Sequence, residues 1–414
     1  MQTALADFIR NTPEGQEADA ILRACVHCGF CMATCPTYQL LGDELDGPRG
    51  RIYLIKEALE GKPVTAKTQL HLDRCLTCRS CETTCPSGVQ YGRLLDIGRH
   101  VVDQRVMRPP AEQAVRWTLR RGLTSPLFGT ALFAGRVAKA VLPKELAAKI
   151  PAGARAGPWP PPRHARKMLV LEGCVQPSLL PSIDAAMARV LDRIGVSLVR
   201  AGGGGCCGAL PHHLSATDEA IVLAKRNIDA WWPQVTRGAE AIVITASGCG
   251  VMVKDYGHLL RRDAGYAEKA QRIAALARDP VEVIGAEWRK VAPVVAMDQG
   301  PLRVGFHSPC TLQHGMKLEG AVEEILLALG FEMTPVADAH LCCGSSGTYS
   351  ILQPELAMQL RARKLKALEA GQPEVIASAN IGCITHLAGG AAVPVRHWIE
   401  LLDARMLGGE RAPR

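Results

Sequence analysis

The chain has 414 residues, a formal net charge of +8 and 16 cysteines. A chain of this length can bury a core without disulfide or metal crosslinks, so the cysteines need another explanation. The sequence opens with MQTALADFIRNTPEGQEADA, which lacks the apolar core of a signal peptide. We therefore expect a reducing cytoplasm, in which clustered cysteines bind metal or carry redox chemistry.

The first predicted domain, residues 1–107, contains two copies of the pattern C-x₂-C-x₂-C-x₃-C-P. These are CVHCGFCMATCP, from Cys25 to Pro36, and CLTCRSCETTCP, from Cys75 to Pro86. Three thiolates at this spacing can bind three irons of a [4Fe–4S] cluster, while the fourth cysteine reaches the other cluster. We therefore assign to the first cluster Cys25, Cys28, Cys31 and Cys85. To the second we assign Cys75, Cys78, Cys81 and Cys35.

Two zinc sites are the alternative, since zinc also binds C-x₂-C pairs. Zinc leaves the third and fourth cysteines and the proline of each pattern unexplained. Thirty-nine residues separate Cys35 from Cys75, and they include the helical run GRIYLIKEALEGK at 50–62. This region resembles the α-helical ferredoxin domains of succinate dehydrogenase and fumarate reductase iron–sulfur subunits. The resemblance implies transfer of single electrons between partners.

Residues 108–165 are predicted to form a basic helical connector and a Pro-rich linker. The segment 111–167 holds eleven Lys and Arg against Glu112 and Glu145, a local charge of +9 that leaves −1 for the rest of the chain. It lacks the interleaved aromatic residues of nucleic-acid binders, so no nucleic acid is expected as partner. Its most apolar window is interrupted by Arg136 and Lys139, which excludes a transmembrane span. We expect contact with a partner or with an anionic membrane face.

Beyond the linker, short apolar runs alternate with longer helical ones, which predicts α/β domains with parallel or mixed sheets. The predicted strands lie at 167–173, 196–201 and 239–248, and again at 302–309, 331–337 and 374–382. Predicted helices at 182–195 and 218–232 recur at 319–330 and 354–370. The chain therefore contains an internal repeat, which we divide into domains at 166–295 and 300–410.

Cysteines define the register of this repeat. Cys174, Cys206, Cys207 and Cys249 recur as Cys310, Cys342, Cys343 and Cys383. Each follows a predicted strand, and the carboxyl ends of parallel strands meet at one edge of a sheet. Each set of four thiols could therefore hold a further cluster, with Gly208 or Gly344 supplying an unusual φ.

The paired cysteines and the glycines before them have two other possible interpretations. A vicinal disulfide would be strained and readily reduced, although Cys207 and Cys343 could then carry redox chemistry. Gly203, Gly205 and Gly208 match the dinucleotide pattern G-x-G-x-x-G, but the second repeat, DAHLCCGSSG, does not preserve it. We therefore expect neither flavin nor nicotinamide in this chain.

The paired-cysteine regions resemble the CCG domain of heterodisulfide reductase catalytic subunits and of several iron–sulfur subunits of flavin dehydrogenases. The family pattern ends in C-x-x-C, but this sequence has Ala246 and Asn380 at the first position of that pair. The difference argues against a non-cubane catalytic cluster of the heterodisulfide type.

Segments spread along the whole chain resemble the iron–sulfur subunits of glycolate oxidase. Among them are HLDRCLTCRSCETTCPSGVQYG, NIDAWWPQV, HLCCGSSGTY and VRHWIELLD. The resemblance implies that separate FAD-bearing subunits oxidise glycolate to glyoxylate. This chain would pass the electrons to a quinone-linked or membrane-linked acceptor from the cytoplasmic face of the inner membrane. No catalytic residue is then expected in it.

The alternatives are a stand-alone thiol–disulfide reductase, a glycerol-3-phosphate or lactate dehydrogenase iron–sulfur subunit, and a docking scaffold. Six histidines near the paired cysteines could be extra ligands or proton carriers, although a histidine in such a place is more often a polar loop or core residue. They are His212, His213, His307, His314, His386 and His397.

Overall fold

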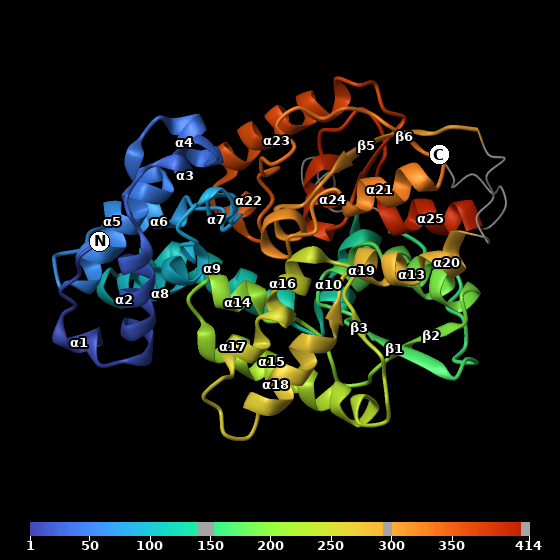
Figure 1. The fold of residues 1–414 in the computed structure, drawn as a ribbon, viewed down its shortest axis with the longest axis horizontal. Helices are drawn as coiled ribbons and strands as arrows, with labels where there is room; N and C mark the ends of the chain where they lie inside the picture. Colours follow the sequence, from blue (N-terminus) through green and yellow to red (C-terminus); the bar gives the residue numbers. More distant parts are fainter. Residues whose placement is uncertain (140–152, 293–299, 407–414) are drawn as a thin grey trace.

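The computed structural model describes residues 1–139, 153–292 and 300–406. Figure 1 shows a helical N-terminal region, in blue, beside two regions that each contain a small sheet. Parts of three predicted segments lie outside the described residues: 140–152 of the connector and linker, 293–295 of the first α/β domain and 407–410 of the second. The predicted fold class is confirmed, whereas the domain boundaries at 107, 165 and 295 stay a prediction.

The N-terminal region consists of short helices around one apolar core, which includes Leu22, Ile55, Leu72 and Leu95. Thr12 and Thr65 cap two of the helices through their side chains, which satisfies backbone N–H groups at the helix starts. The helices are α1 (Asp7–Arg10), α2 (Pro13–Ala24), α3 (Phe30–Ala33), α4 (Pro36–Leu41), η1 (Glu44–Asp46), α5 (Pro48–Leu59), α6 (Ala66–Asp73), α7 (Ser80–Thr84) and α8 (Tyr91–Arg105).

The first α/β repeat contains a parallel sheet with strand order β2-β1-β3-β4. Its strands are β1 (Arg166–Val170), β2 (Val196–Arg200), β3 (Ile242–Val243) and β4 (Ala277–Arg278). Its helices are α12 (Gln176–Leu179), α13 (Ser182–Arg193), α14 (Ala209–His213), α15 (Thr217–Val235), α16 (Ser247–Lys254), α17 (Tyr256–Leu259), α18 (Ala267–Leu276), α19 (Pro280–Ala286) and α20 (Trp288–Val291).

The second repeat has the same topology, with parallel strand order β6-β5-β7-β8. Its strands are β5 (Arg303–His307), β6 (Glu332–Met333), β7 (Val375–Ser378) and β8 (Val395–His397). Its helices are η3 (Thr311–Gly315), α21 (Ala321–Ala328), α22 (Tyr349–Leu352), α23 (Pro354–Glu369), α24 (Ile381–Ala388) and α25 (Trp398–Met406). The sequence predicted three strands per repeat. It missed the fourth strands, β4 with two residues and β8 with three.

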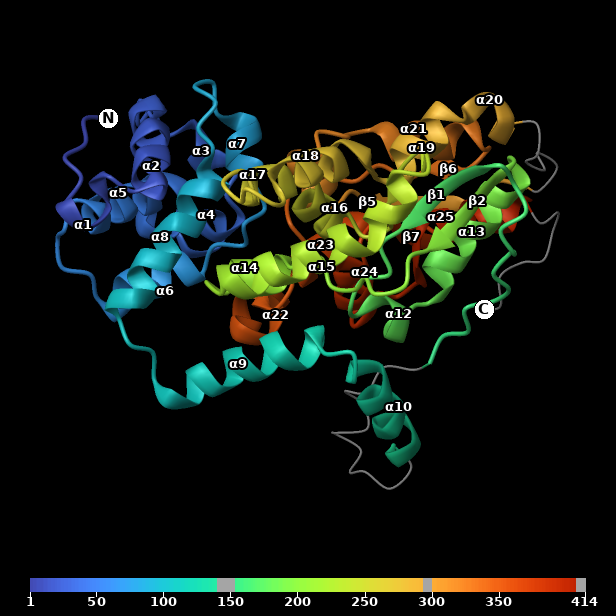
Figure 2. The same ribbon diagram turned by 90° about the horizontal axis from the view of Figure 1, so that it is seen from below.

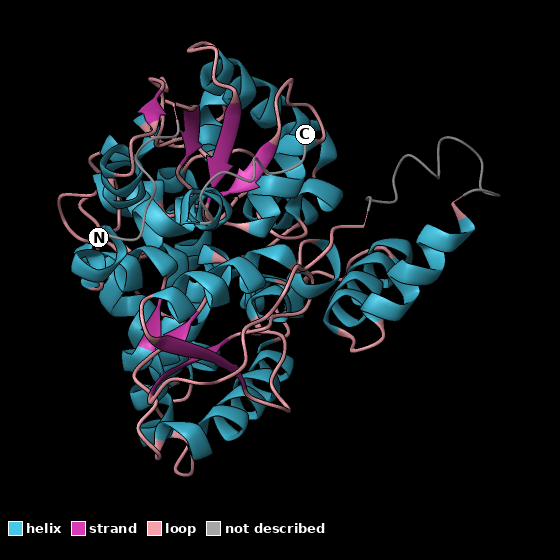
Figure 3. Ribbon diagram, turned by 90° about the vertical axis from the view of Figure 1, so that its right-hand side faces the viewer, coloured by secondary structure: helices cyan, strands magenta, loops and turns pink. Residues whose placement is uncertain are grey.

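The two repeats pack against each other through one continuous apolar core. Residues of both sheets contribute to it, among them Val243 and Phe306, and so does the fully buried Trp398. Polar contacts complete the interface: the Ser247 N–H donates to the Ala379 carbonyl at 3.1 Å, and Nε2 of His397 donates to the Thr245 carbonyl at 2.9 Å. Figure 3 shows the resulting pair of separate sheets, surrounded by helices.

The N-terminal region is held to the first repeat by ion pairs. Asp96 of α8 lies 3.4 Å from His212 and 3.3 Å from His213, and Glu17 of α2 lies 2.8 Å from Arg261. Burial alone raises the pKa of Asp96, but the two imidazoles lower it well below its ordinary value. These histidines therefore join two regions of the fold, which agrees with their interpretation as polar structural residues.

The basic connector forms two helices, α9 (Pro110–Thr124) and α10 (Phe128–Ala138), which lie along one side of the rest of the protein (Figure 2). Several of its arginines are used internally: Arg116 pairs with Asp73 at 2.8 Å, and Arg120 and Arg121 pair with Glu219. Trp117, Leu127 and Phe133 are exposed. Among the described helices, none has the length and apolar character needed to cross a bilayer. Attachment of the connector to a membrane or partner stays a prediction.

Asp279 at the start of α19 makes stability depend on pH. Burial raises the pKa of this carboxyl from 3.8 to about 7. Between pH 3.8 and about pH 7 the carboxyl is protonated in the folded protein and ionised in the unfolded chain, so the free energy of unfolding falls as the pH rises. Above about pH 7 the buried carboxyl is ionised, and the free energy of unfolding has lost about 4 kcal/mol at most. As the pH rises from about 5.5 to about 8, we expect the free energy of unfolding of the wild type to fall by about 2 kcal/mol relative to that of Asp279→Asn. Urea denaturation at each pH would measure both values.

The amide of Asp279→Asn can still accept the Val281 N–H bond, which is 3.0 Å long in the wild type. The same substitution at an exposed aspartate of α15, Asp229→Asn, is the matched control. Parallel pH profiles for the wild type and Asp279→Asn would contradict the assignment.

Candidate metal centres

Site 1 is a cavity lined by Cys25, Cys28, Cys31 and Cys85. The structure thus brings together the four cysteines assigned to the first cluster, from two motifs that lie far apart in sequence. Burial, with the neighbouring Cys25 and Cys85 thiols, raises the pKa of Cys31 to about 11. Cys28 is exposed, so site 1 opens to the protein surface. A bound metal is the natural partner for such thiols, since it stabilises their thiolate form.

Site 2 is a cavity lined by Cys35, Cys75, Cys78 and Cys81, the four cysteines assigned to the second cluster. Burial, reinforced by nearby thiols, raises the pKa values of Cys78 and Cys81 well above their ordinary range. Cys81 also lines site 1, so the two sites are direct neighbours. The donor sets and their separation into two adjoining cavities fit two [4Fe–4S] clusters.

The two cysteine loops have the same backbone conformation. His27 and Gly29 have φ values of +60° and +87°, and the corresponding Thr77 and Arg79 have +55° and +61°. These left-handed residues turn each loop sharply before α3 and α7, whose first turns carry Cys31 and Cys81. Because the turns alternate with the cysteines, the loop bends around its own cavity. Left-handed φ at three non-glycine residues marks a backbone held in place by its surroundings.

A fully buried cation lies beside site 2. Arg51 of α5 donates to Thr37 Oγ1 at 3.2 Å and to the His71 carbonyl at 2.7 Å, and Asp46 Oδ1 lies 3.5 Å away. Burial alone lowers the pKa of Arg51, but Cys75, Cys35 and Asp46 raise it above its ordinary value. Arg51 therefore stays positively charged and offsets the negative charge of bound thiolates.

A second arginine holds the loop that carries Cys75. Arg99 of α8 donates to the Leu72 carbonyl at 2.8 Å and to the Cys75 carbonyl at 2.7 Å. Its guanidinium also reaches Thr77 Oγ1 at 3.2 Å. The Thr77 N–H in turn donates to the Cys75 sulfur at 3.4 Å. Sequence reasoning missed Arg51 and Arg99, although an arginine on the apolar face of each helix was the available signal.

Site 3 is the set of paired-cysteine thiols in the first repeat. Hydrogen bonds link its sulfur atoms in the order Cys174, Cys206, Cys207 and Cys249. The bonds from Cys174 and Cys207 lower the pKa of Cys206 to about 3. Behind the pair, Asn227 Nδ2 donates to the Cys206 carbonyl at 2.8 Å and the Tyr256 hydroxyl donates to the Cys207 carbonyl at 2.7 Å.

Site 4 is the corresponding set in the second repeat, linked in the order Cys310, Cys342, Cys343 and Cys383. The structure therefore brings together both predicted sets at the carboxyl ends of the strands. None of the sixteen cysteines, all within the described residues, forms a disulfide. Four converging thiols in each set fit a metal cluster.

Glycine follows each cysteine pair for two physical reasons. Gly208 and Gly344 have φ values of +89° and +91°, as the sequence predicted. A Cβ atom would also lie 3.0 Å from the Ala220 carbonyl oxygen at Gly208 and 2.6 Å from the Ala357 oxygen at Gly344. Helix α23 thus passes too close to Gly344 for a side chain to fit without a shift, and α15 lies almost as close to Gly208. Each glycine N–H donates to the first sulfur of its pair at 3.4 Å.

Site 4 is packed directly against site 2. Cys78 and Leu76 share one apolar cluster with Cys310, Cys342 and Tyr349. The Tyr349 hydroxyl donates to the Arg74 carbonyl at 3.1 Å, and Ser346 Oγ donates to the Leu76 carbonyl at 2.6 Å. A cavity of about 560 Å³ continues from Cys75 and Cys78 to the cysteines of sites 3 and 4, Cys343 excepted. The four sites therefore form one connected system.

Models of two known families match three segments of the chain. The 4Fe-4S dicluster domain matches residues 21–89, and the Cysteine-rich domain matches residues 168–254 and 304–388. The Glycolate oxidase iron-sulfur subunit of Escherichia coli (strain K12) is 56% identical over 405 residues, which cover 97% of this chain and 98% of that protein. The Probable glycolate oxidase iron-sulfur subunit of Bacillus subtilis (strain 168) is 29% identical over 419 residues, which cover 93% of this chain and 91% of that protein.

Shorter relatives share only part of this arrangement. Lactate utilization protein A of Exiguobacterium sp. (strain ATCC BAA-1283 / AT1b) is 26% identical over 236 residues. The match covers 56% of this chain and 94% of that protein. The two longer relatives therefore match this chain over nearly its whole length.

We expect Gly344→Ala to destabilise the second repeat by about 2 kcal/mol or more, because the left-handed φ alone costs about 1–2 kcal/mol and the Ala357 carbonyl must also move. Thermal and urea denaturation would measure the change. Gly122→Ala is the control: this glycine lies inside α9 with open space around it, and the substitution should be neutral or slightly stabilising. Equal stability of the two variants would show that the close approach has no energetic cost.

Proposed function

This chain belongs to the family of glycolate oxidase iron–sulfur subunits, and on that premise we propose that it relays electrons from FAD-bearing subunits that oxidise glycolate to glyoxylate. The electrons would leave for a quinone-linked acceptor. The observation that carries the proposal is the contact of Cys78 with Cys310 and Cys342 in one apolar cluster. It brings site 2 of the N-terminal region into direct contact with site 4 of the second repeat.

In this proposal, the eight N-terminal cysteines divide between the two clusters in the way that the sequence predicts. Cys25, Cys28, Cys31 and Cys85 hold the first, while Cys35, Cys75, Cys78 and Cys81 hold the second. A [4Fe–4S] cluster, when bound, accepts and returns single electrons. The protein residues hold the sulfur atoms in place and compensate charge through Arg51.

The exposed rim of site 1 supports a docking position for the FAD-bearing subunits. Cys28 is exposed, and beside it Val26 and Phe30 are 67% and 62% exposed. Site 2 has no comparable exposure, because Cys75 and Cys81 are buried. An apolar rim of this kind would exclude water once a partner covers it.

The sequence alternative of a stand-alone thiol–disulfide reductase is not favoured. It would require a site that functions without partner subunits, whereas the chain belongs to a family of named subunits along 97% of its length. The glycerol-3-phosphate and lactate alternatives are likewise not favoured.

We expect Cys28→Ser or Cys78→Ser to abolish electron delivery to the final acceptor, because each removes one thiolate from a [4Fe–4S] site. Glycolate oxidation by the FAD-bearing subunits with an artificial acceptor should remain largely intact. Both activities would be measured on the purified complex. Equal loss of the two activities would overturn the relay assignment.

We also expect Phe30→Glu to weaken binding of the FAD-bearing subunits about tenfold, the effect of losing about 1.4 kcal/mol at an apolar contact. Titration of labelled subunit against its partners would measure the affinity. Val222 offers a control, since it is equally exposed, at 66%, on α15 of the first repeat. The docking position is wrong if Val222→Glu weakens binding as much as Phe30→Glu does.

A further inference from the structure

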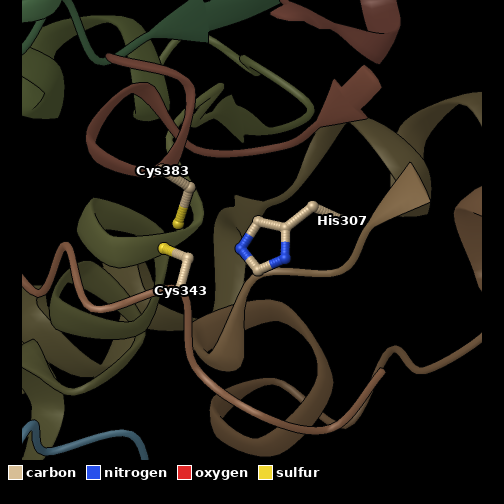
Figure 4. A group of neighbouring side chains, drawn as sticks. All are labelled: His307, Cys343 and Cys383. Atoms are coloured by element: carbon tan, nitrogen blue, oxygen red, sulfur yellow. The ribbon is translucent and has the colours of Figure 1, made fainter. Parts of the chain in front are cut away.

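The imidazole of His307 lies at the end of β5, beside two thiols of site 4. One ring nitrogen and the sulfur atoms of Cys343 and Cys383 all lie within 4.8 Å of one another. Figure 4 shows that the ring edge carrying Nε2 faces both sulfur atoms. The side chain is 1% exposed. Three donor atoms from three separate segments therefore converge on one buried point.

His307 differs from neighbouring histidines in its hydrogen bonding. Neither of its ring nitrogens has a partner among the described residues. His397 uses both nitrogens, towards the Thr245 carbonyl and the Ile399 N–H, and Nε2 of His386 donates to the Ala357 carbonyl at 3.2 Å. A buried polar group normally has a partner, and leaving it without one costs free energy. A metal bound at Nε2 would supply the missing partner.

The first repeat has no equivalent nitrogen. The spacing that relates Cys174 to Cys310 places Leu171 opposite His307, and both residues lie at the carboxyl ends of equivalent strands, β1 and β5. Leu171 is buried in one apolar cluster with Cys207, against which Cys249 packs. The two repeats therefore share their cysteines, and at this position only the second has a nitrogen donor.

Thiolate and imidazole together suit iron or zinc and do not suit Mg²⁺ or Ca²⁺. Site 4 adjoins site 2, a [4Fe–4S] site, and we assign iron to it. We propose that His307 is a nitrogen ligand of the iron centre in site 4, beside Cys343 and Cys383, and that site 3 binds iron through sulfur alone. Site 4 would then be a mixed sulfur and nitrogen site.

This inference deepens the proposed relay function and rests on it. A neutral imidazole adds a donor atom to site 4 without adding negative charge, and ligand identity is one of the factors that set the reduction potential of an iron–sulfur centre. Because sites 3 and 4 have the same four cysteines, the iron centre of site 4 should differ in potential from its counterpart in site 3 through His307.

Pulsed EPR of the full chain tests the ligand directly. The protein would be produced with ¹⁵N-histidine, purified anaerobically with its iron and poised at several potentials. We expect a coupled histidine nitrogen in the wild type and in the control His386→Asn, and its loss in His307→Leu. The midpoint potential of the same signal should shift in His307→Leu and stay unchanged in His386→Asn. Iron and zinc per chain would be measured in all three proteins.

Several results would overturn the proposal: no coupled histidine nitrogen in the wild type, a coupling that survives in His307→Leu, zinc in site 4, or no iron beyond that of the two [4Fe–4S] clusters. If His307→Leu fails to fold, the wild-type spectrum can still reject the proposal, because absence of a coupled nitrogen means that no histidine is a ligand. Reduction of the complex by glycolate is a separate measurement of the relay. Reduction without nitrogen coupling rejects only the ligand, and coupling without reduction rejects only the relay.

Discussion

The physical constraint on which this structure depends is the gathering of anionic sulfur atoms in a water-poor interior. Neighbouring thiols and burial both raise the pKa of Cys31, and at Cys78 the same two causes act more strongly. Such groups can be ionised together only if cations lie close to them. Bound iron supplies most of that charge in a [4Fe–4S] site, and Arg51 adds a fixed positive charge beside Cys35 and Cys75.

Much of the surrounding structure serves to hold the sulfur atoms in position. Left-handed residues turn both cysteine loops through the same conformation, and Arg99 binds the carbonyls of the second loop. In the repeats, strand ends position the cysteines, and Gly208 and Gly344 allow α15 and α23 to approach the cysteine pairs closely. Side chains far from the motifs in sequence thus determine whether each set of thiols can hold metal.

The two repeats share topology and cysteine spacing, but they have different surroundings. Site 4 packs against Cys78 and the loop of site 2, whereas the first repeat meets the N-terminal region through ion pairs such as that of Asp96 with His212. Duplication therefore produced two similar metal-site frameworks within one asymmetric assembly. The asymmetry is functional in our proposal, because it leaves one repeat beside site 2 and gives that repeat an extra nitrogen donor.

The sequence by itself determined the cysteine motifs, their spacing, the internal repeat and the alternation of strands and helices, because these are periodic patterns along the chain. It also predicted an unusual φ at Gly208 and Gly344, because glycine has no Cβ atom and adopts such φ values without steric cost. Only the tertiary structure decided that Cys78 meets Cys310, that Arg51 lies beside site 2, and that His307 differs from His386 and His397. Those facts depend on contacts between segments far apart in sequence, which no local pattern encodes.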